Sequence, residues 1–239
     1  MDYRDRHVVV TGGTGALGTA VVGALLAAGA LCHVPYRSES AAKRFPHADN
    51  KRVSLVALRD LVDEAAVTAF YGGLDQLWAS IHIAGAFAFA PIAKSDKALL
   101  LGQLNANLVS AYLCSRAAVA AFERTGAGGR IVNVAARHAL EPRLGASLTA
   151  YAVAKAGLSA LLMILADEWE SMRHLRVNGV VPGPMRSPLR AQTHPGDDVA
   201  HLPPPETFVP LYLYLIAGQP KKESGGVIDA QAWLARLPV

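Results

Sequence analysis

A tyrosine and a lysine, Tyr151 and Lys155, are the two side chains in this sequence best suited to moving a proton together. The residues between them are Ala, Val and Ala, in a stretch with a helical pattern. Side chains four residues apart project from one face of a helix, so the ammonium is expected beside the phenol. A neighbouring cation lowers the pKa of a phenol below its usual value of about 10. The pair therefore predicts a general acid or base, although an amphipathic pair on an ordinary helix surface has the same spacing.

A glycine-rich turn near the start of the chain has the chemistry to hold a dinucleotide. Residues 11–18 read TGGTGALG and lie between a strand-like run of three valines at 8–10 and a predicted helix over 16–28. Glycines allow a tight bend and the close approach of a pyrophosphate, whose charge is stabilised by amides at the helix N-terminus. A turn of this kind can also serve packing alone. The contacts expected with a cofactor are Gly12, Thr14, Gly15, Ala16, Leu17 and Gly18.

The end of the second predicted strand indicates which dinucleotide is preferred. The strand ends Val-Pro-Tyr-Arg37, and the next carboxylate is Glu39. An arginine here accommodates a 2′-phosphate, whereas an acid would bind the free ribose hydroxyl. We therefore expect NADP(H) in preference to NAD(H), with NAD(H) still possible, unless Arg37 is only a solvated loop cation. After the third strand, Asp60 and Leu61 are expected near the adenine, and the alternative role of Asp60 is an N-cap of the next helix.

The elements that must position these residues alternate along the whole chain. Such alternation predicts repeated βαβ units, hence a Rossmann-type, doubly wound parallel sheet in a three-layer αβα arrangement. With no linker visible, residues 1–239 are expected to form a single α/β domain. The predicted strands are 7–11, 31–36, 52–57, 76–83, 129–135, 176–181 and 226–229. The predicted helices are 16–28, 39–44, 60–71, 97–124, 148–172 and 205–217.

Composition excludes several classes of protein. Hydrophobic residues make up 52% and charged residues 18%, which indicates a compact interior. A net charge of +4 without a basic stripe argues against nucleic-acid binding. The apolar runs around 78–91 and 157–166 are too short to cross a bilayer, and no signal peptide is evident, so we expect a soluble cytoplasmic protein. The two cysteines and eight histidines lack metal-site spacing, so no metal is expected.

A proline-rich segment, 182–205, interrupts the regular alternation. Its prolines and glycines prevent a long helix. A long irregular segment inside a compact domain is more often a lid or a binding loop than a core element. Residues expected to line a substrate pocket from this part of the chain are Met185, Leu189, Phe208 and Tyr212.

With the turn, the Tyr151/Lys155 pair, Asn178 and Pro182-Gly183 in this order, the sequence resembles the short-chain dehydrogenase/reductase family over essentially its whole length. The resemblance implies that Tyr151 donates the proton and that Lys155 bonds the nicotinamide ribose and lowers the phenol's pKa. It also implies a water relay to this lysine from Asn107, which could instead be a polar helix-face residue with Asn105 as a nearby decoy. Further cofactor contacts implied by the family are Ala84, Gly85, Pro182, Gly183 and Ser187.

The sequence departs from the family pattern beside the substrate. Ile83 replaces the asparagine of the family's Asn-Ala-Gly loop, and Ala136 takes the place of the serine that usually binds the substrate carbonyl. Counting thirteen residues back from Tyr151 reaches His138, so a two-residue insertion could bring that side chain in as a donor. An isolated loop histidine is more often a surface residue. The candidate substrate contacts are therefore Ala136, His138 and Met185.

The missing serine bears on the substrate. Losing one donor to a developing oxyanion typically costs about 3–4 kcal/mol, so a strongly electrophilic substrate, such as a small cyclic carbonyl or imine-like compound, is expected. The dihydropteridine reductases, an atypical branch of the family, manage without this serine, and their glycine turn and Ala-Gly loop are similar to those here. A quinonoid dihydropterin is therefore an alternative substrate, and a non-catalytic NADP-binding sensor or scaffold is an alternative function. The family resemblance also implies a homodimer or homotetramer.

Overall fold

The computed structural model describes residues 3–126, 128–170, 175–217 and 224–237, and it contains one sheet of seven parallel strands. The strand order is β3-β2-β1-β4-β5-β6-β7, and every neighbouring pair is parallel. This order confirms the predicted doubly wound, Rossmann-like α/β fold. The strands are β1 (His7–Thr11), β2 (Leu31–Tyr36), β3 (Val53–Ala57), β4 (Ala79–His82), β5 (Gly129–Val134), β6 (Leu175–Val181) and β7 (Val227–Asp229).

The chain reverses its direction of travel across the sheet beside β1. After β1 it passes outward to β2 and β3, and it then crosses back to pair β4 with the other side of β1. The loops that leave the carboxyl ends of β1 and β4 therefore diverge and open a crevice between them. Ligands of open α/β sheets bind at such a crevice.

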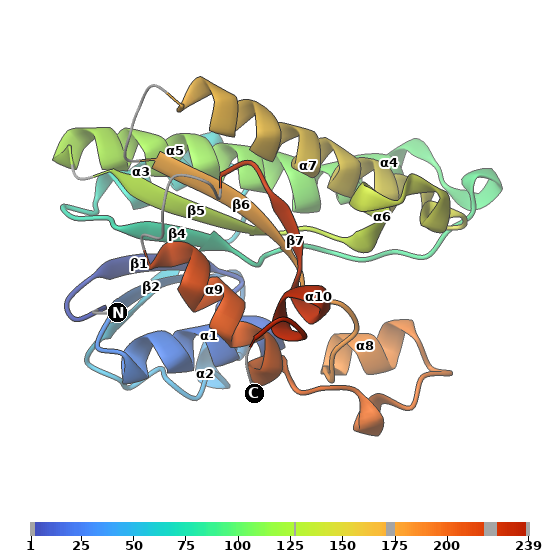
Figure 1. The fold of residues 1–239 in the computed structure, drawn as a ribbon, viewed down its shortest axis with the longest axis horizontal. Helices are drawn as coiled ribbons and strands as arrows, with labels where there is room; N and C mark the ends of the chain where they lie inside the picture. Colours follow the sequence, from blue (N-terminus) through green and yellow to red (C-terminus); the bar gives the residue numbers. More distant parts are fainter. Residues whose placement is uncertain (1–2, 127, 171–174, 218–223, 238–239) are drawn as a thin grey trace.

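Helices cover both faces of the sheet and form the outer two of three layers (Figure 1). On one face lie α1 (Ala16–Ala27) and α9 (Val209–Ile216), which pack with β1 and β2 into one apolar cluster. The other face carries α3 (Glu64–Gly72), α5 (Ser110–Thr125) and α7 (Thr149–Glu168), which form a second cluster. Burial on both faces explains why the strands read as almost continuous apolar runs rather than as alternating ones.

Several boundaries differ from those expected. The helix predicted over 97–124 is divided into α4 (Lys97–Leu104), a π-helical turn η2 (Asn105–Val109) and α5. The helix expected to begin at residue 60 begins at Glu64, because Asp63 caps it by accepting a hydrogen bond from Ala66 N at 3.0 Å. The strand expected over 76–83 is the shorter β4. The helix predicted over 148–172 ends at Glu168, and positions 171 and 172 lie outside the described residues.

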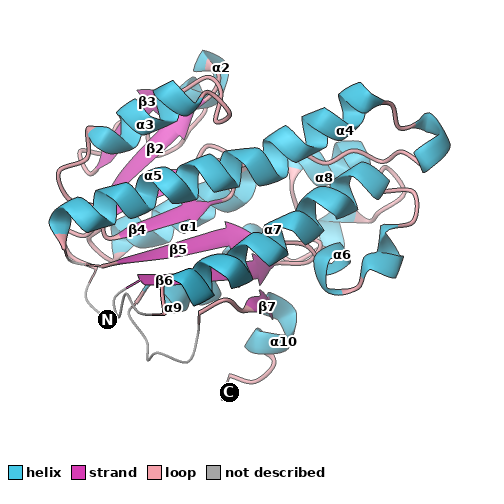
Figure 2. Ribbon diagram, turned by 90° about the horizontal axis from the view of Figure 1, so that it is seen from above, coloured by secondary structure: helices cyan, strands magenta, loops and turns pink. Residues whose placement is uncertain are grey.

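Short helices gather at the carboxyl end of the strands. Figures 1 and 2 both place α4, α6 (Arg137–Leu140) and α8 (Pro188–Thr193) together at this end. The sequence pattern predicts neither α6 nor α8, since each spans at most six residues. The other short helical segments are α2 (Glu39–Lys43), η1 (Ile92–Lys94), η3 (Pro142–Gly145), η4 (Val199–His201), η5 (Pro205–Phe208) and α10 (Ala230–Leu234).

Helix α7 is apolar enough, and at 20 residues long enough, to cross a membrane by length and composition. The prediction that its apolar run is too short for this was wrong. One side of the helix is nonetheless a core element, because Leu158 and Leu162 are buried against the sheet. The core helix of a soluble protein can pass the same test of length and composition.

Candidate active site

A cavity of about 960 Å³ opens at the carboxyl ends of the strands. Its wall contains nearly every residue expected to bind cofactor or substrate. Four expected residues are absent from it: Lys155 and Asn107, which lie buried behind this wall, and Phe208 and Tyr212, which lie in the core. The expected residues that line the cavity are Gly12, Thr14, Gly15, Ala16, Leu17, Gly18, Arg37, Asp60, Leu61, Ala84, Gly85, Ala136, His138, Tyr151, Pro182, Gly183, Met185 and Ser187.

The glycine turn after β1 has the geometry of a dinucleotide cradle. Gly12 has a φ of +68°, and a Cβ there would lie 2.6 Å from Ala84 N; a Cβ at Gly18 would lie 2.1 Å from Gly12 O. Only glycine fits where the helix and the next loop approach the turn so closely. At the start of α1 the N-cap residue, Gly15, has no capping side chain, and the first turn holds no acid. The helix N-terminus is therefore suited to an anionic group such as a pyrophosphate.

Cations line the part of the cavity next to β2 and β3. Arg37 and Arg59 both contribute to the wall, and neither forms an ion pair with a carboxylate in the described part of the chain. Glu39, the nearest acid after β2, accepts a hydrogen bond from the Tyr36 hydroxyl at 3.1 Å. The acid that binds a free ribose hydroxyl usually ends the second strand, and in this chain Arg37 follows that strand instead.

Asp60 lies in the wall of the cavity, where an adenine contact was expected. Its Oδ1 accepts a hydrogen bond from Val62 N at 3.0 Å, which folds the loop after β3 back on itself. The N-cap of α3 is Asp63 rather than Asp60, so the alternative role considered for Asp60 was wrong.

Tyr151 lies in the first turn of α7, and its ring is flanked by two other rings. Phe87 lies 5.0 Å away between ring centroids at an interplanar angle of 66°, and His138 lies 5.7 Å away at 77°. Burial raises the pKa of the Tyr151 phenol to about 12. The sequence-based expectation of a pKa below 10 was therefore wrong, because burial of the phenol raises its pKa instead.

Lys155 is hydrogen-bonded to the backbone at the end of β5. Its side chain is almost fully buried, and Nζ donates a 2.6 Å hydrogen bond to the carbonyl of Val134 at the end of β5. The distance from Nζ to the Tyr151 ring centroid is 6.0 Å. Burial lowers the pKa of Lys155 to about 8, so the amine changes charge near physiological pH. The i, i+4 spacing correctly places both residues on one side of α7, but it does not fix where the long lysine side chain ends.

Asn107 lies in the π-helical turn η2 and fastens the loop after β4. Its Nδ2 donates to the carbonyl of Ala86 at 2.9 Å, and its Oδ1 accepts from Ala86 N at 3.3 Å. A Cβ at Gly85 would lie 2.8 Å from the same Oδ1. Asn105, considered as a decoy, contributes to the cavity wall. Asn107 therefore acts on the cavity through the backbone of this loop, and π-helical turns often occur at functional sites.

After β5, where the family pattern has a serine hydroxyl, this chain has the methyl group of Ala136. Ala136 is buried and lines the cavity at the start of α6. The next residue, Arg137, also lines the cavity and forms ion pairs with Asp229 at 3.5 Å and with Glu141 at 4.0 Å. His138 follows and contributes to the cavity wall. The structure thus places the imidazole in the cavity wall, as the alternative interpretation of the spacing allowed.

The segment 182–205 forms one side of the cavity. Gly183 has a φ of +78°, a conformation that favours glycine after β6. Ser187 lines the cavity and also caps α8, since its Oγ accepts from Arg190 N at 3.0 Å. Two of the four expected pocket residues, Met185 and Leu189, line the cavity. The other two, Phe208 and Tyr212, were wrongly assigned, because both are fully buried in the core between α1 and the sheet.

The sequence analysis missed several residues of the cavity wall. Phe87 connects the two sides of the site, since its ring lies 5.0 Å from Tyr151 and 5.1 Å from His194. Single aromatic residues in loops carry no periodic signal, so only the fold reveals them. Arg59 could have been found, because it directly precedes Asp60 at the end of the third strand. Other residues missed in the wall include Asn105, Ser110, Arg190, Asp229 and Gln231.

Comparison with known proteins agrees with this geometry. The family model for short chain dehydrogenases matches residues 6–198. The uncharacterized oxidoreductase YciK of Escherichia coli (strain K12) is 37% identical over 82 residues, which cover 34% of this chain and 32% of that protein. The 2-dehydro-3-deoxy-D-gluconate 5-dehydrogenase of Formosa agariphila is 30% identical over 212 residues, covering 82% of this chain and 77% of that protein.

A solved structure shows the same fold. It is a short chain dehydrogenase from Shigella flexneri 2a str. 301 complexed with NADP, with a TM-score of 0.84 and 23% sequence identity. The alignment covers 96% of this chain and 99% of that one. Because the family model matches most of the chain, the assignment does not depend on this structural likeness. The chain belongs to the short-chain dehydrogenase/reductase family of NAD(P)-dependent oxidoreductases.

Proposed function

We propose that this protein is an NADP(H)-dependent oxidoreductase that acts on a small cyclic carbonyl or imine-like compound. The observation that carries the proposal is that the glycine turn and Tyr151 line one cavity. When bound, the nicotinamide supplies or accepts the hydride. The chain supplies the cradle for its phosphates, the proton and the enclosure of the substrate. Holding two reactants together in this way accounts for much of the rate enhancement of such enzymes.

The preference for NADP(H) rests on the charges near β2 and β3. Arg37 and Arg59 bring two positive charges to the cavity wall, and Glu39 is bonded to Tyr36. This arrangement favours a 2′-phosphate over a free hydroxyl. The Shigella flexneri structure of the same fold is complexed with NADP, which is in keeping with the proposal.

Tyr151 is the proposed proton donor. With the pKa of its phenol raised to about 12, the side chain keeps its proton throughout the neutral range and can give it to an oxygen or nitrogen that gains charge. A positioned general acid contributes about 10²–10⁴-fold to the rate. Lys155 would bind the nicotinamide ribose. Asn107 would hold the nearby loop that contains Gly85 and Ala86. The supporting observation is the continuous packing of this loop, Asn107 and Lys155 behind the cavity wall.

The remaining parts of the proposal concern the whole molecule. We assign the 182–205 segment as the lid over the substrate within a single cytoplasmic domain of residues 1–239. We also propose a homodimer or homotetramer formed through α5 and α7. Support comes from large apolar side chains that these helices expose, each at least half exposed: Tyr112, Val153, Met163 and Ile164.

The chemistry of the substrate follows from Ala136. Because Ala136 has no hydroxyl to polarise a carbonyl, we favour a reacting group that is electrophilic in itself, as in an activated cyclic ketone or a quinonoid dihydropterin. A quinonoid dihydropterin remains the alternative substrate class. The non-catalytic NADP-binding sensor or scaffold is the alternative function.

A titration followed by stopped-flow kinetics tests the proposal. NADPH fluorescence first measures binding, and NADPH oxidation is then followed with isatin, a cyclic ketone, and with a quinonoid dihydropterin. We expect NADPH to bind and at least one probe to be reduced. Binding without oxidation would reject the proposed substrate class and favour the non-catalytic sensor or scaffold. Absence of binding would reject both functions.

A further inference from the structure

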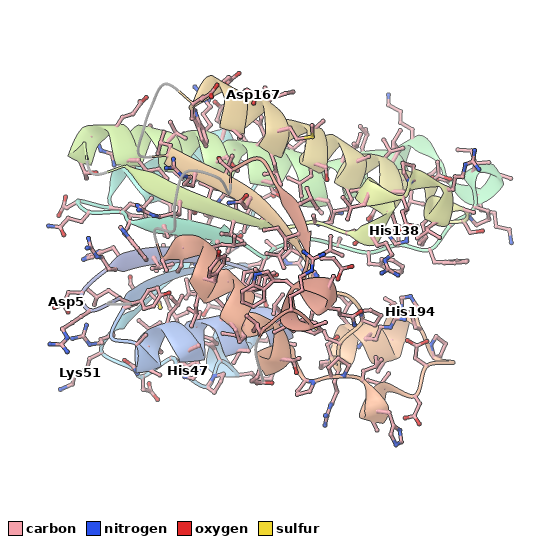
Figure 3. The ribbon with its side chains drawn as sticks, in the orientation of Figure 1. Asp5, His47, Lys51, His138, Asp167 and His194 are labelled. Atoms are coloured by element: carbon pink, nitrogen blue, oxygen red, sulfur yellow. The ribbon has the colours of Figure 1, made fainter. Side chains whose placement is uncertain are left out.

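His138 faces the reacting part of the cavity from the first turn of α6. Its ring stands edge-on to that of Tyr151, with 5.7 Å between centroids. Figure 3 shows the side chain projecting from α6 toward α8, where His194 is labelled. Both histidines line the cavity, so each is a candidate to contact a substrate held next to Tyr151.

The two histidines differ in their hydrogen bonds. His194 is bonded at both ring nitrogens, with Nδ1 2.8 Å from Thr193 Oγ1 and Nε2 3.0 Å from a nitrogen of Arg190. Nδ1 of His138 is buried and has no partner among the described residues. Seven described residues contain such an unpartnered atom, and His138 is the one of these seven that lines the cavity. An unpartnered buried polar atom costs about 1–3 kcal/mol, so a bound ligand that turns the ring and gives Nδ1 a partner removes this penalty.

The side chains next to His138 differ from it in chemistry. Ala136 ends in a methyl group, and Arg137, which also lines the cavity, is a permanent cation that forms ion pairs with Asp229 and Glu141. Burial lowers the pKa of His138, so the imidazole is neutral at pH 7 and carries one N–H. A neutral imidazole can donate a hydrogen bond without bringing a charge into an apolar site.

We propose that His138 donates a hydrogen bond to the substrate oxygen that receives the proton of Tyr151. This inference rests on the proposed function and names the second donor of that same site. In the reduction, the hydride forms a bond to the carbonyl carbon and the π pair of the C=O bond moves to the oxygen. The phenolic proton of Tyr151 then forms the new O–H bond. His138 keeps its own proton throughout and stabilises the charge that develops on the oxygen.

Four variants test the role, with isatin as the probe. His138→Phe keeps a ring but removes the donor, and His138→Gln keeps a donor. Ala136→Ser in the His138→Phe background puts a hydroxyl on the same side of Tyr151. His47→Phe is the control, because His47 lies beside α1 and far from the cavity (Figure 3).

We expect kcat for His138→Phe to fall about 100-fold, with KM and the Kd for NADPH nearly unchanged. His138→Gln should stay within about tenfold of wild type, and Ala136→Ser should restore most of the loss. If His138→Phe does not fold, judged by its Tm, His138→Ala replaces it. Unchanged kcat in a folded variant that lacks the donor would overturn this inference and leave the proposed function intact. A wild-type protein that binds NADPH but does not reduce isatin would overturn the inference together with the carbonyl substrate class.

Discussion

The cavity has two halves that are built by different means. The cofactor half comes from the loops after β1, β2 and β3 and includes the glycine turn, whose backbone lies close against other backbone. The substrate half comes from α6, from the 182–205 segment and from the loop that carries Phe87, where side chains form the wall. In the first half a single methyl group would collide with backbone, as at Gly12 and Gly18. In the second half, rings contact rings at centroid distances of 5.0–5.7 Å.

This difference determines how each half tolerates change. Backbone collisions cannot be relieved by a new rotamer, so the cofactor half allows few sequences. Side-chain contacts can be remade with other side chains of similar volume, so the substrate half can change its ligand while the fold stays the same. The replacement of a hydroxyl by Ala136, together with a histidine two residues later, is a change of this second kind.

The largest effect is expected where the backbone has no room. Gly12→Ala would place a Cβ 2.6 Å from Ala84 N at a φ of +68°. Left-handed backbone alone costs about 1–2 kcal/mol for a residue with a side chain, and the collision adds to it. We expect the Kd for NADPH to rise at least about 100-fold.

A matched glycine variant controls for the change of residue type. A Cβ at Gly72, in the last turn of α3, would meet no heavy atom within 4 Å. Gly72→Ala should therefore leave the Kd for NADPH unchanged in the same fluorescence titration. Wild-type binding by Gly12→Ala would show that the turn is not a tight cradle and would remove the contrast between the two halves.

The next largest effect is on stability and concerns His82, whose ring is hydrogen-bonded to side chains of β4 and β5. Its Nε2 lies 2.8 Å from Ser80 Oγ, and its Nδ1 lies 3.1 Å from Asn133 Oδ1. Burial lowers its pKa from 6.5 to about 4, so the unfolded chain takes up the proton first as the pH falls. The contribution of His82 to stability is thus complete above pH 6.5, declines as the pH falls toward 4, and changes no further below that.

Urea unfolding at pH 7 and at pH 4.5 measures this loss. We expect the free energy of unfolding of the wild type to fall by about 2–3 kcal/mol more than that of His82→Gln, which has no titrating ring. The comparison between the two proteins cancels contributions from the other histidines, including His33. Equal losses in both would show that His82 is not held neutral by burial.

The smallest expected effect is on the Kd for NADPH, and it tests whether the cofactor half prefers NADPH to NADH. Arg37→Ser removes one of the two cations near the proposed 2′-phosphate, so the Kd for NADPH should rise about tenfold while that for NADH stays the same. Arg44→Ser is the matched control, since Arg44 is an exposed arginine at the end of α2 outside the cavity wall. An equal rise for both cofactors would mean that Arg37 does not distinguish them.

The sequence predicted the cofactor half better than the substrate half, because the first depends on local backbone patterns and the second on tertiary packing. A strand, a glycine turn and a helix leave a local pattern, and the turn from Gly12 to Gly18 lies where that pattern placed it. The ends of helices and the orientation of long side chains depend on tertiary packing. The helix predicted to begin at residue 60 thus begins at Glu64, and the amine of Lys155 bonds Val134 instead of lowering the pKa of Tyr151.

Errors in the substrate half arose from residues that are far apart in the chain. Phe208 and Tyr212 follow the proline-rich segment directly, but the apolar face of α9 turns them into the core. Phe87 and His194 have no pattern of their own and become neighbours only because the loops after β4 and β6 meet at the carboxyl edge of the sheet. Contacts of this kind follow from topology, which local sequence patterns do not contain.

Single-turnover kinetics of Tyr151→Phe tests the central claim most directly, namely that the Tyr151 hydroxyl gives its proton to the substrate inside the cavity that holds the cofactor. The variant keeps the ring that packs against Phe87 and removes only the hydroxyl. With NADPH bound and isatin or the quinonoid dihydropterin added, we expect the rate of NADPH oxidation to fall about 10³-fold with an unchanged Kd for NADPH. A variant that oxidises bound NADPH at the wild-type rate would contradict the claim.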